Sequence, residues 1–146
     1  DMAMRHDISK VIREVRPQVV ITHNPMRDLD STYGSHPDHI ATGEATMCAV
    51  YPDARNPFAF PGSECAQLED WAVSEVWVML GAEANDFVDI TEQLDRKIRA
   101  LRCHESQHRD PDGMEERVRE WWKSIAAERG RPEGTSAEAF RVVDTK

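Results

Sequence analysis

Apolar residues recur at helical spacing at the start of the chain and then form a short unbroken run. The helical stripe consists of Met4, Ile8, Val11, Ile12 and Val15. This spacing predicts an amphipathic helix over residues 2–16, which Pro17 should end. The run at residues 18–22 is β-branched and has no charged interruption, which indicates a strand buried on both faces. A helix followed by such a strand is typical of a parallel α/β sheet.

A polar loop and a second helix follow this strand. Residues 23–35 are rich in Asn, Pro, Asp, Ser and Gly and should form a long loop. A helix is expected from Pro37 to about Tyr51, because proline at the first helical position loses no hydrogen bond. Downstream, the pattern predicts two strands, two helices and a closing strand at residues 75–80, 87–90, 91–107, 114–130 and 139–143. This order predicts an α/β fold with a mostly parallel sheet and flanking helices.

Composition limits the class of protein. The chain has 146 residues, enough for one domain with a hydrophobic core, so residues 1–146 are expected to form a single domain. With 18 Lys and Arg against 27 Asp and Glu, the net charge of −9 argues against binding to nucleic acid or to an anionic membrane. No apolar run is long enough for a membrane span. The 3 cysteines lack close pairing, which favours a cytoplasmic location.

His36 and His39 provide the candidate chemistry. They lie three residues apart at the start of the predicted second helix, so both imidazoles should project from the same end. The positive end of the helix dipole disfavours a protonated ring, and neutral imidazole is the form that binds a metal. Asp38 is placed to accept a hydrogen bond from one ring. The same spacing also fits surface histidines at an ordinary N-cap, but the preceding loop and strand favour a site, which His23 is a candidate to line.

A resemblance makes this pattern more specific. The segment Thr32-Tyr33-Gly34-Ser35-His36-Pro37-Asp38-His39, followed by Ala41-Thr42-Gly43, resembles the second signature of the LmbE-like (PIG-L-like) N-deacetylase superfamily. Residues 16–25 are similar to the strand and loop that enter this motif, and residues 99–107 to a family helix that ends in His-x-Ser-Gln. The resemblance covers about residues 5–143.

The resemblance implies a Rossmann-like α/β fold and zinc-dependent hydrolysis of N-acetylated sugars or related amides. By this resemblance, His39 would be a Zn²⁺ ligand, and His36 would stabilise the oxyanion or protonate the leaving amine. Asp38 would orient His36. Tyr33 would bind substrate near the reacting carbonyl, although Ser35 adds one residue to the spacing of the family.

One part of the family pattern is absent. In this superfamily the other two zinc ligands and the general base come from an N-terminal Ala-His-Pro-Asp-Asp block, which the sequence lacks. Catalytic zinc needs three protein ligands and an open position. The chain is therefore interpreted as the C-terminal part of the domain, active on a small N-acylated substrate only with the missing N-terminal segment. The alternative is a non-catalytic fragment or partner subunit. The sequence also leaves open whether the protein forms a homo-oligomer.

Two smaller patterns complete the set of candidates. The segment from His104 to His108 satisfies the zincin pattern His-Glu-x-x-His, in which both rings share one helix face and Glu105 would be the base. It lies at the end of its predicted helix, directly before a helix-breaking segment, which disfavours a metallopeptidase. Arg55, in the loop after the motif helix, is a candidate for binding a hydroxyl-rich or anionic substrate, or equally for a surface ion pair.

Overall fold

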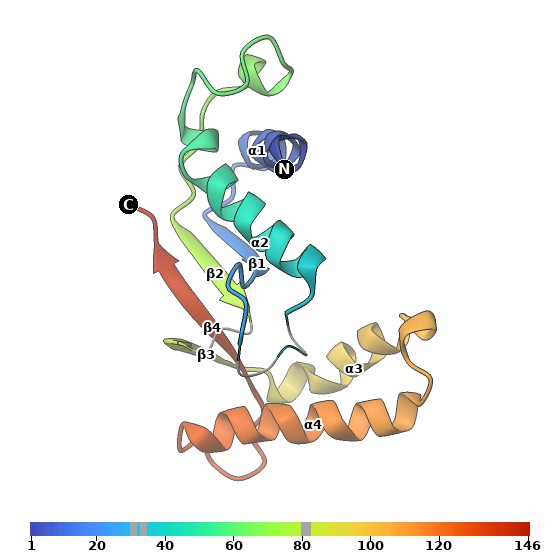
Figure 1. The fold of residues 1–146 in the computed structure, drawn as a ribbon. Coiled ribbons are helices and arrows are strands. Elements are labelled where there is room, and N and C mark those ends of the chain that lie inside the picture. The colour runs from blue at the N-terminus through green and yellow to red at the C-terminus, as the bar shows by residue number, and fades with distance from the viewer. Residues whose placement is uncertain (30–31, 33–34, 80–82) are drawn as a thin grey trace. The chain divides into compact units, whose positions relative to one another are not determined.

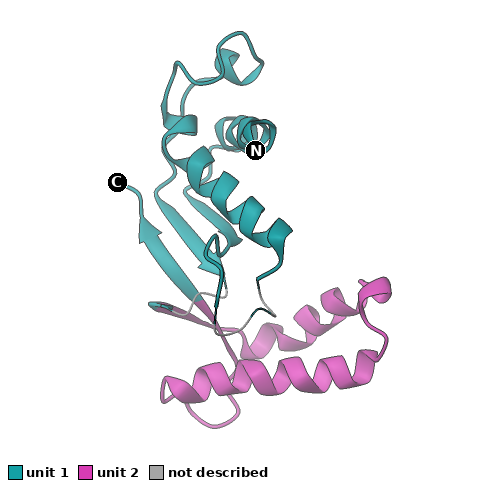
Figure 2. Ribbon diagram, in the orientation of Figure 1, with its two compact units in different colours: residues 1–85, 140–146 teal, residues 86–139 magenta. Residues whose placement is uncertain are grey.

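The computed structural model describes residues 1–29, 32, 35–79 and 83–146. The chain divides into two compact units (Figure 2). Unit 1 contains residues 1–85 and 140–146, and unit 2 contains residues 86–139. The expectation of a single domain over residues 1–146 stays a prediction.

Two of the predicted helices form as expected in unit 1 (Figure 1). Helix α1 is Met2–Val15, and the side chain of Asp1 caps it by accepting a hydrogen bond from the backbone N of Ala3 at 2.9 Å. Helix α2 is Pro37–Val50 and begins at the predicted proline. The two helices pack against each other, and α2 also contacts the first strand. Apolar periodicity therefore located α1 correctly, and the proline at the first helical position located the start of α2.

Among the described residues, the sheet has four strands and is mixed, so the prediction of a mostly parallel sheet is wrong. Its strand order is β1-β2-β4-β3, with bounds Val19–His23 for β1, Glu75–Met79 for β2, Asp86–Asp89 for β3 and Ala137–Asp144 for β4. Strand β1 pairs in parallel with β2, whereas β2 pairs with β4 in antiparallel orientation. An apolar run predicts a strand but carries no information on its direction. The α/β class is correct, and the Rossmann-like topology stays a prediction.

Strand β1 is not buried on both faces, contrary to the prediction. Val19 is 40% exposed and Ile21 is 57% exposed, whereas Thr22 is buried. Because β1 is the first strand in the order, its outer edge pairs with no strand in the described part of the chain. The sequence run has the composition of a central strand, but in this chain the strand lies at an edge with one face uncovered.

A buried arginine fixes the irregular segment that follows α2. The core of unit 1 is formed by Ile12, Ala49, Val50, Ala54, Val73, Val76 and Val78. Beside it, the guanidinium of Arg13 donates hydrogen bonds to four backbone carbonyls, those of Asp53, Ala54, Asn56 and Cys65. Two short 3-10 turns, Asp53–Arg55 and Cys65–Gln67, lie in this segment. Arg13 therefore supplies the donors that a segment without regular structure needs.

Unit 2 contains two helices whose ends differ from the prediction. Helix α3 is Leu94–Arg102, shorter than the predicted 91–107, and 3-10 turns precede and follow it. Helix α4 is Pro111–Glu128, because Asp110 caps it and proline is accepted at its first position. The core consists of Ile90, Leu94, Ile98 and Trp122. In the described ranges, no helix combines the length and hydropathy that a membrane span requires.

Candidate functional site

The start of α2 carries the predicted histidines. His36 is the N-cap residue, with extended backbone angles of φ −61° and ψ 132°, and its carbonyl accepts the first helical hydrogen bond from Ile40 at 3.1 Å. His39 lies in the first helical turn. Before the helix, the hydroxyl of Ser35 is buried and accepts a hydrogen bond from the backbone N of Asp28 at 2.9 Å. Ser35 is therefore held to Asp28 directly before the two histidines.

A third histidine joins the pair from the end of β1. The rings of His23 and His39 are stacked, with centroids 4.1 Å apart and planes 10° from parallel. The rings of His36 and His39 lie 5.1 Å apart at 37°. The loop residues 24–35 separate His23 from the helix in sequence, so the contact depends on how β1 and α2 pack. The sequence suggested His23 only as a lining residue and gave no signal of this stack.

The environment of His23 favours its neutral form. Burial lowers the pKa of His23 most, and the neighbouring His39 lowers it further, whereas Asp38 opposes both effects. A neutral imidazole stacks on a second imidazole without charge repulsion. A neutral His23 ring can therefore remain stacked on His39 at neutral pH.

The roles of Asp38 and Tyr33 remain predictions. The backbone carbonyl of Asp38 accepts a hydrogen bond from the Thr42 hydroxyl at 2.8 Å. Between described residues, no hydrogen bond joins the Asp38 carboxylate to His36, so an orienting role for Asp38 has no contact to support it here. Tyr33 lies outside the described residues.

The described residues do not form a complete zinc site. Zinc catalysis needs three protein ligands. Within residues 1–29, 32, 35–79 and 83–146, no group of three His, Cys, Asp or Glu side chains is arranged to hold a metal ion. His23 and His39 stack face to face rather than converge on one point. These side chains can contribute to a metal site but do not make one.

Arg55 lies away from the histidines, at the other end of the strands. Its Nη2 donates hydrogen bonds to the carbonyl of Val73 at 3.2 Å and to the hydroxyl of Thr145 at 2.8 Å. Val73 precedes β2, whereas His23 pairs with Met79 at the last position of that strand. The structure therefore ties Arg55 to the strand ends opposite the histidines, and its predicted contact with substrate stays a prediction.

The zincin pattern does not form the helix that it requires. Helix α3 ends at Arg102, and His104 and His108 lie on either side of a 3-10 turn, Glu105–Gln107. His108 has extended backbone angles of φ −122° and ψ 97°. The two rings cannot share the face of one continuous helix, so the metallopeptidase alternative loses its structural basis.

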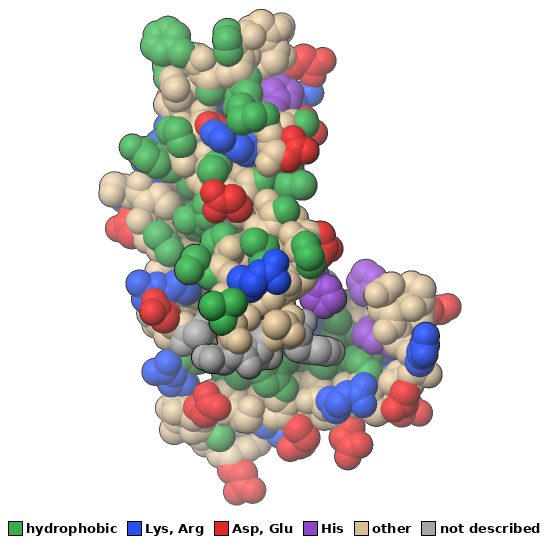
Figure 3. Space-filling view, in the orientation of Figure 1, with side chains coloured by type: hydrophobic (Ala, Val, Ile, Leu, Met, Phe, Trp, Pro, Cys, Tyr) green, Lys and Arg blue, Asp and Glu red, His purple; other side chains and the backbone are tan. Residues whose placement is uncertain are grey.

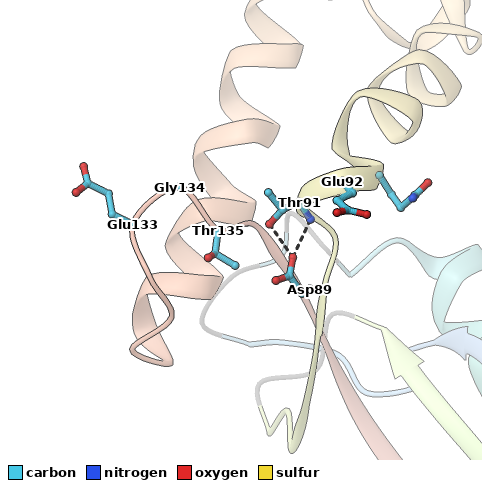
Figure 4. Close-up of a pocket in the computed structure, with 7 residues that line it drawn as sticks. Asp89, Thr91, Glu92, Glu133, Gly134 and Thr135 are labelled. Carbon is cyan, nitrogen blue, oxygen red and sulfur yellow. Dashed lines mark hydrogen bonds between the residues drawn. The ribbon is translucent and has the colours of Figure 1, made fainter.

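A surface pocket in unit 2 has a different character (Figure 4). Its lining contains three carboxylates, from Asp89, Glu92 and Glu133, and no histidine. Thr91 donates two hydrogen bonds to Asp89, from its backbone N at 2.9 Å and its hydroxyl at 2.6 Å, and these bonds hold the pKa of Asp89 below its usual value. A carboxylate held ionised in this way is a poor general acid. The histidines of unit 1 are the stronger candidate.

Proteins of known activity resemble this chain in sequence. The profile of the PIG-L family, described as GlcNAc-PI de-N-acetylase, matches residues 2–50. Diacetylchitobiose deacetylase of Thermococcus kodakarensis is 31% identical over 145 residues, covering 96% of this chain and 50% of that protein. The 1D-myo-inositol 2-acetamido-2-deoxy-alpha-D-glucopyranoside deacetylase of Rhodococcus erythropolis is 33% identical over 123 residues, covering 66% and 40%. The chain thus spans about half the length of the relatives it matches.

Solved structures share the fold. The N,N'-diacetylchitobiose deacetylase of Pyrococcus horikoshii, complexed with its inhibitor MPG, matches with a TM-score of 0.78 and 26% identity, covering 99% of this chain and 52% of that chain. GalB, the 4-carboxy-2-hydroxymuconate hydratase of Pseudomonas putida, matches with a TM-score of 0.73 at 19% identity, which shows the fold alone. On the family profile and these deacetylase relatives, the chain belongs to the LmbE-like (PIG-L-like) deacetylase superfamily.

Proposed function

We propose that this chain carries one part of the active site of a zinc-dependent hydrolase that removes an acetyl group from an N-acetylglucosamine-type substrate. The observation that carries the proposal is the pair of imidazoles, His36 and His39, at the start of α2 with their centroids 5.1 Å apart. The relatives named for the deacetylation of diacetylchitobiose and of an acetamido-glucopyranoside support the reaction and the class of substrate.

Each residue of the motif has a separate part in this proposal. His39 provides one zinc ligand, and zinc supplies the activation of water when it is bound. His36, in its protonated form, donates a hydrogen bond to the oxygen of the tetrahedral intermediate and then a proton to the departing amine nitrogen. Asp38 stabilises that protonated ring, and Tyr33 contacts the substrate near the carbonyl. Both last roles follow from the family resemblance.

A further segment of the same protein completes the site in this proposal. The described residues lack a full donor set, and the chain spans about half of its relatives. The outer edge of β1 pairs with no strand among the described residues and offers a place for an additional strand. The exposed side chains of Val19 and Ile21 leave one face of β1 for such a segment to cover. The alternative is a non-catalytic fragment or partner subunit, which contributes His39 to a site that a second polypeptide completes. In either case we retain a cytoplasmic location as part of the proposal.

Acetate release tests the reaction. The protein expressed from its full-length gene is incubated with N,N'-diacetylchitobiose, and free acetate is quantified. Replacing His39 by alanine should abolish release, and His36→Ala should lower kcat by about 10²–10³-fold, the usual effect of removing a group that stabilises an oxyanion. His6→Ala is the matched control, because His6 lies in α1 against Phe60 and should leave the rate unchanged. Wild-type rates in both site variants would contradict the proposal.

A further inference from the structure

His23 lies against the proposed zinc ligand and has no assigned part in the reaction. Its ring covers the face of His39 with a centroid distance of 4.1 Å and an interplanar angle of 10°. Face contact of this kind restricts the plane of a ring and leaves its nitrogens free for other partners. His23 is half-buried at the last position of β1, where pairing with Met79 of β2 fixes its backbone. Of the two stacked residues, His23 is therefore the one whose backbone the sheet holds in place.

Gly43 explains how the end of β1 comes so close to α2. It lies four residues after His39, hence on the same face of the helix. A Cβ at this position would lie 2.5 Å from the carbonyl O of His23 and 2.9 Å from the backbone N of Pro25. Both neighbours are backbone atoms, which cannot rotate away. Only glycine permits this approach, which brings the His23 ring next to the ring one helical turn earlier.

Among the described residues, His39 makes no hydrogen bond that would fix its ring. Between described residues, neither of its ring nitrogens makes a hydrogen bond, and its ring contacts are those with His23 and His36. In most metal sites the second nitrogen of a ligand histidine donates a hydrogen bond that sets the orientation of the ring. The contact that His39 does have on its face is the stacked ring of His23.

We propose that His23 is a positioning residue, which stacks on His39 and, through the close contact at Gly43, holds that imidazole in the orientation for binding zinc. This inference rests on the proposed function, because it takes His39 as a zinc ligand. His23 itself binds neither metal nor substrate. The side chain therefore needs a flat face, and its nitrogens are dispensable.

Zinc affinity of a set of variants tests this role. The dissociation constant for Zn²⁺ is measured by competition with a chromophoric chelator, on protein expressed from the full-length gene. Loss of an outer-shell partner typically weakens metal binding by about 10–100-fold, which is the effect expected for His23→Ala and Gly43→Ala. His23→Phe keeps a flat ring and should bind zinc nearly as the wild type does. Glu44→Ala, an exposed neighbour of Gly43, is the matched control.

A second measurement reports the stack without any metal. In residues 1–146, the ring protons of His39 should show an upfield ring-current shift in ¹H–¹³C NMR spectra. That shift should persist in His23→Phe and disappear in His23→Ala and Gly43→Ala. A residue that acts only on stability would change the unfolding temperature and leave these ring signals and the zinc affinity of the folded protein unchanged.

The outcomes separate the two proposals. If His39→Ala abolishes zinc binding and His23→Ala binds as tightly as the wild type, the positioning role is wrong and the proposed function stands. If His23→Phe loses as much affinity as His23→Ala, His23 acts through its nitrogens, which also overturns the positioning role. If His39→Ala binds zinc normally, the proposed function fails, and the role of His23 fails with it.

Discussion

The two units of this protein are stabilised in different ways. In unit 1, Arg13 is 3% exposed and uses its guanidinium to bind four backbone carbonyls. In unit 2, the arginines lie at the surface, where Arg102 and Arg119 share Glu115 and also contact Asp112 and Asp95. Acidic and basic side chains lie side by side on parts of the visible face in Figure 3. Buried polar contacts fix one arrangement, whereas exposed ion pairs add little stability.

This difference indicates which unit can hold the side chains of an active site in fixed positions. The histidine cluster lies in unit 1, where β1, α2 and the segment after α2 are held by buried contacts. An active site needs side chains held by rigid neighbours, because small displacements reduce catalysis strongly. Unit 2 places His104 and His108 at the two ends of one short 3-10 turn, Glu105–Gln107, whose residues are exposed. It lacks such support for its histidines.

The largest effect on the free energy of unfolding is expected when a large side chain is removed from the core of unit 2. Trp122 is 4% exposed, and truncating a buried tryptophan to alanine costs about 3–5 kcal/mol. Hydrogen exchange should show that Trp122→Ala removes amide protection in α3 and α4 while β1 and α2 stay protected. Trp121→Ala, at a position 44% exposed, should cost less than about 1 kcal/mol. Equal loss of protection in both units would show that they unfold together.

A smaller effect is expected from the buried arginine of unit 1. Arg13→Met keeps the apolar stem and leaves four carbonyls without their donor, and each unpaired buried group costs about 1–3 kcal/mol where water cannot reach it. We expect a loss of about 3 kcal/mol in urea unfolding, since solvent will reach part of the segment. Arg16→Met is the control, because Arg16 pairs with exposed Glu69. A similar cost for both variants would contradict the importance of burial.

The smallest effect concerns thiol reactivity, which reports each unit separately. Cys65 in unit 1 is fully buried, and burial raises its pKa, so less of the reactive thiolate is present at neutral pH than in an ordinary cysteine. Cys103 in unit 2 is exposed. In the native protein a thiol reagent should label Cys103 first and Cys65 only after unit 1 opens, with Cys48 replaced by serine. Mass spectrometry of peptides measures this order, and rapid labelling of Cys65 would contradict it.

Much of the fold, and the position of the candidate histidines at the start of a helix, followed from local sequence patterns. Periodicity and Pro37 set the start of α2, which fixes where His36 and His39 lie. The direction of β4 and the exposure of Ile21 did not follow, because they depend on which strands lie beside them. The sequence also did not predict the stack of His23 on His39, because this contact depends on the packing of Gly43 against the end of β1. Local signals predict elements, and tertiary contacts decide how side chains meet.

The fold by itself does not decide the reaction. A deacetylase and a hydratase both match this chain, with TM-scores of 0.78 and 0.73. Function depends on the side chains at the site. The decisive evidence must therefore come from individual histidines.

Bound zinc in four single variants tests most directly whether the metal site lies at the start of α2. The protein is expressed from its full-length gene, and zinc per polypeptide is measured by mass spectrometry for the alanine variants of His36, His39, His104 and His108. We predict that His39→Ala loses the metal while His36→Ala, His104→Ala and His108→Ala retain it. Loss of zinc from His104→Ala or His108→Ala, with full zinc in His39→Ala, would place the metal in unit 2 and contradict the proposed site.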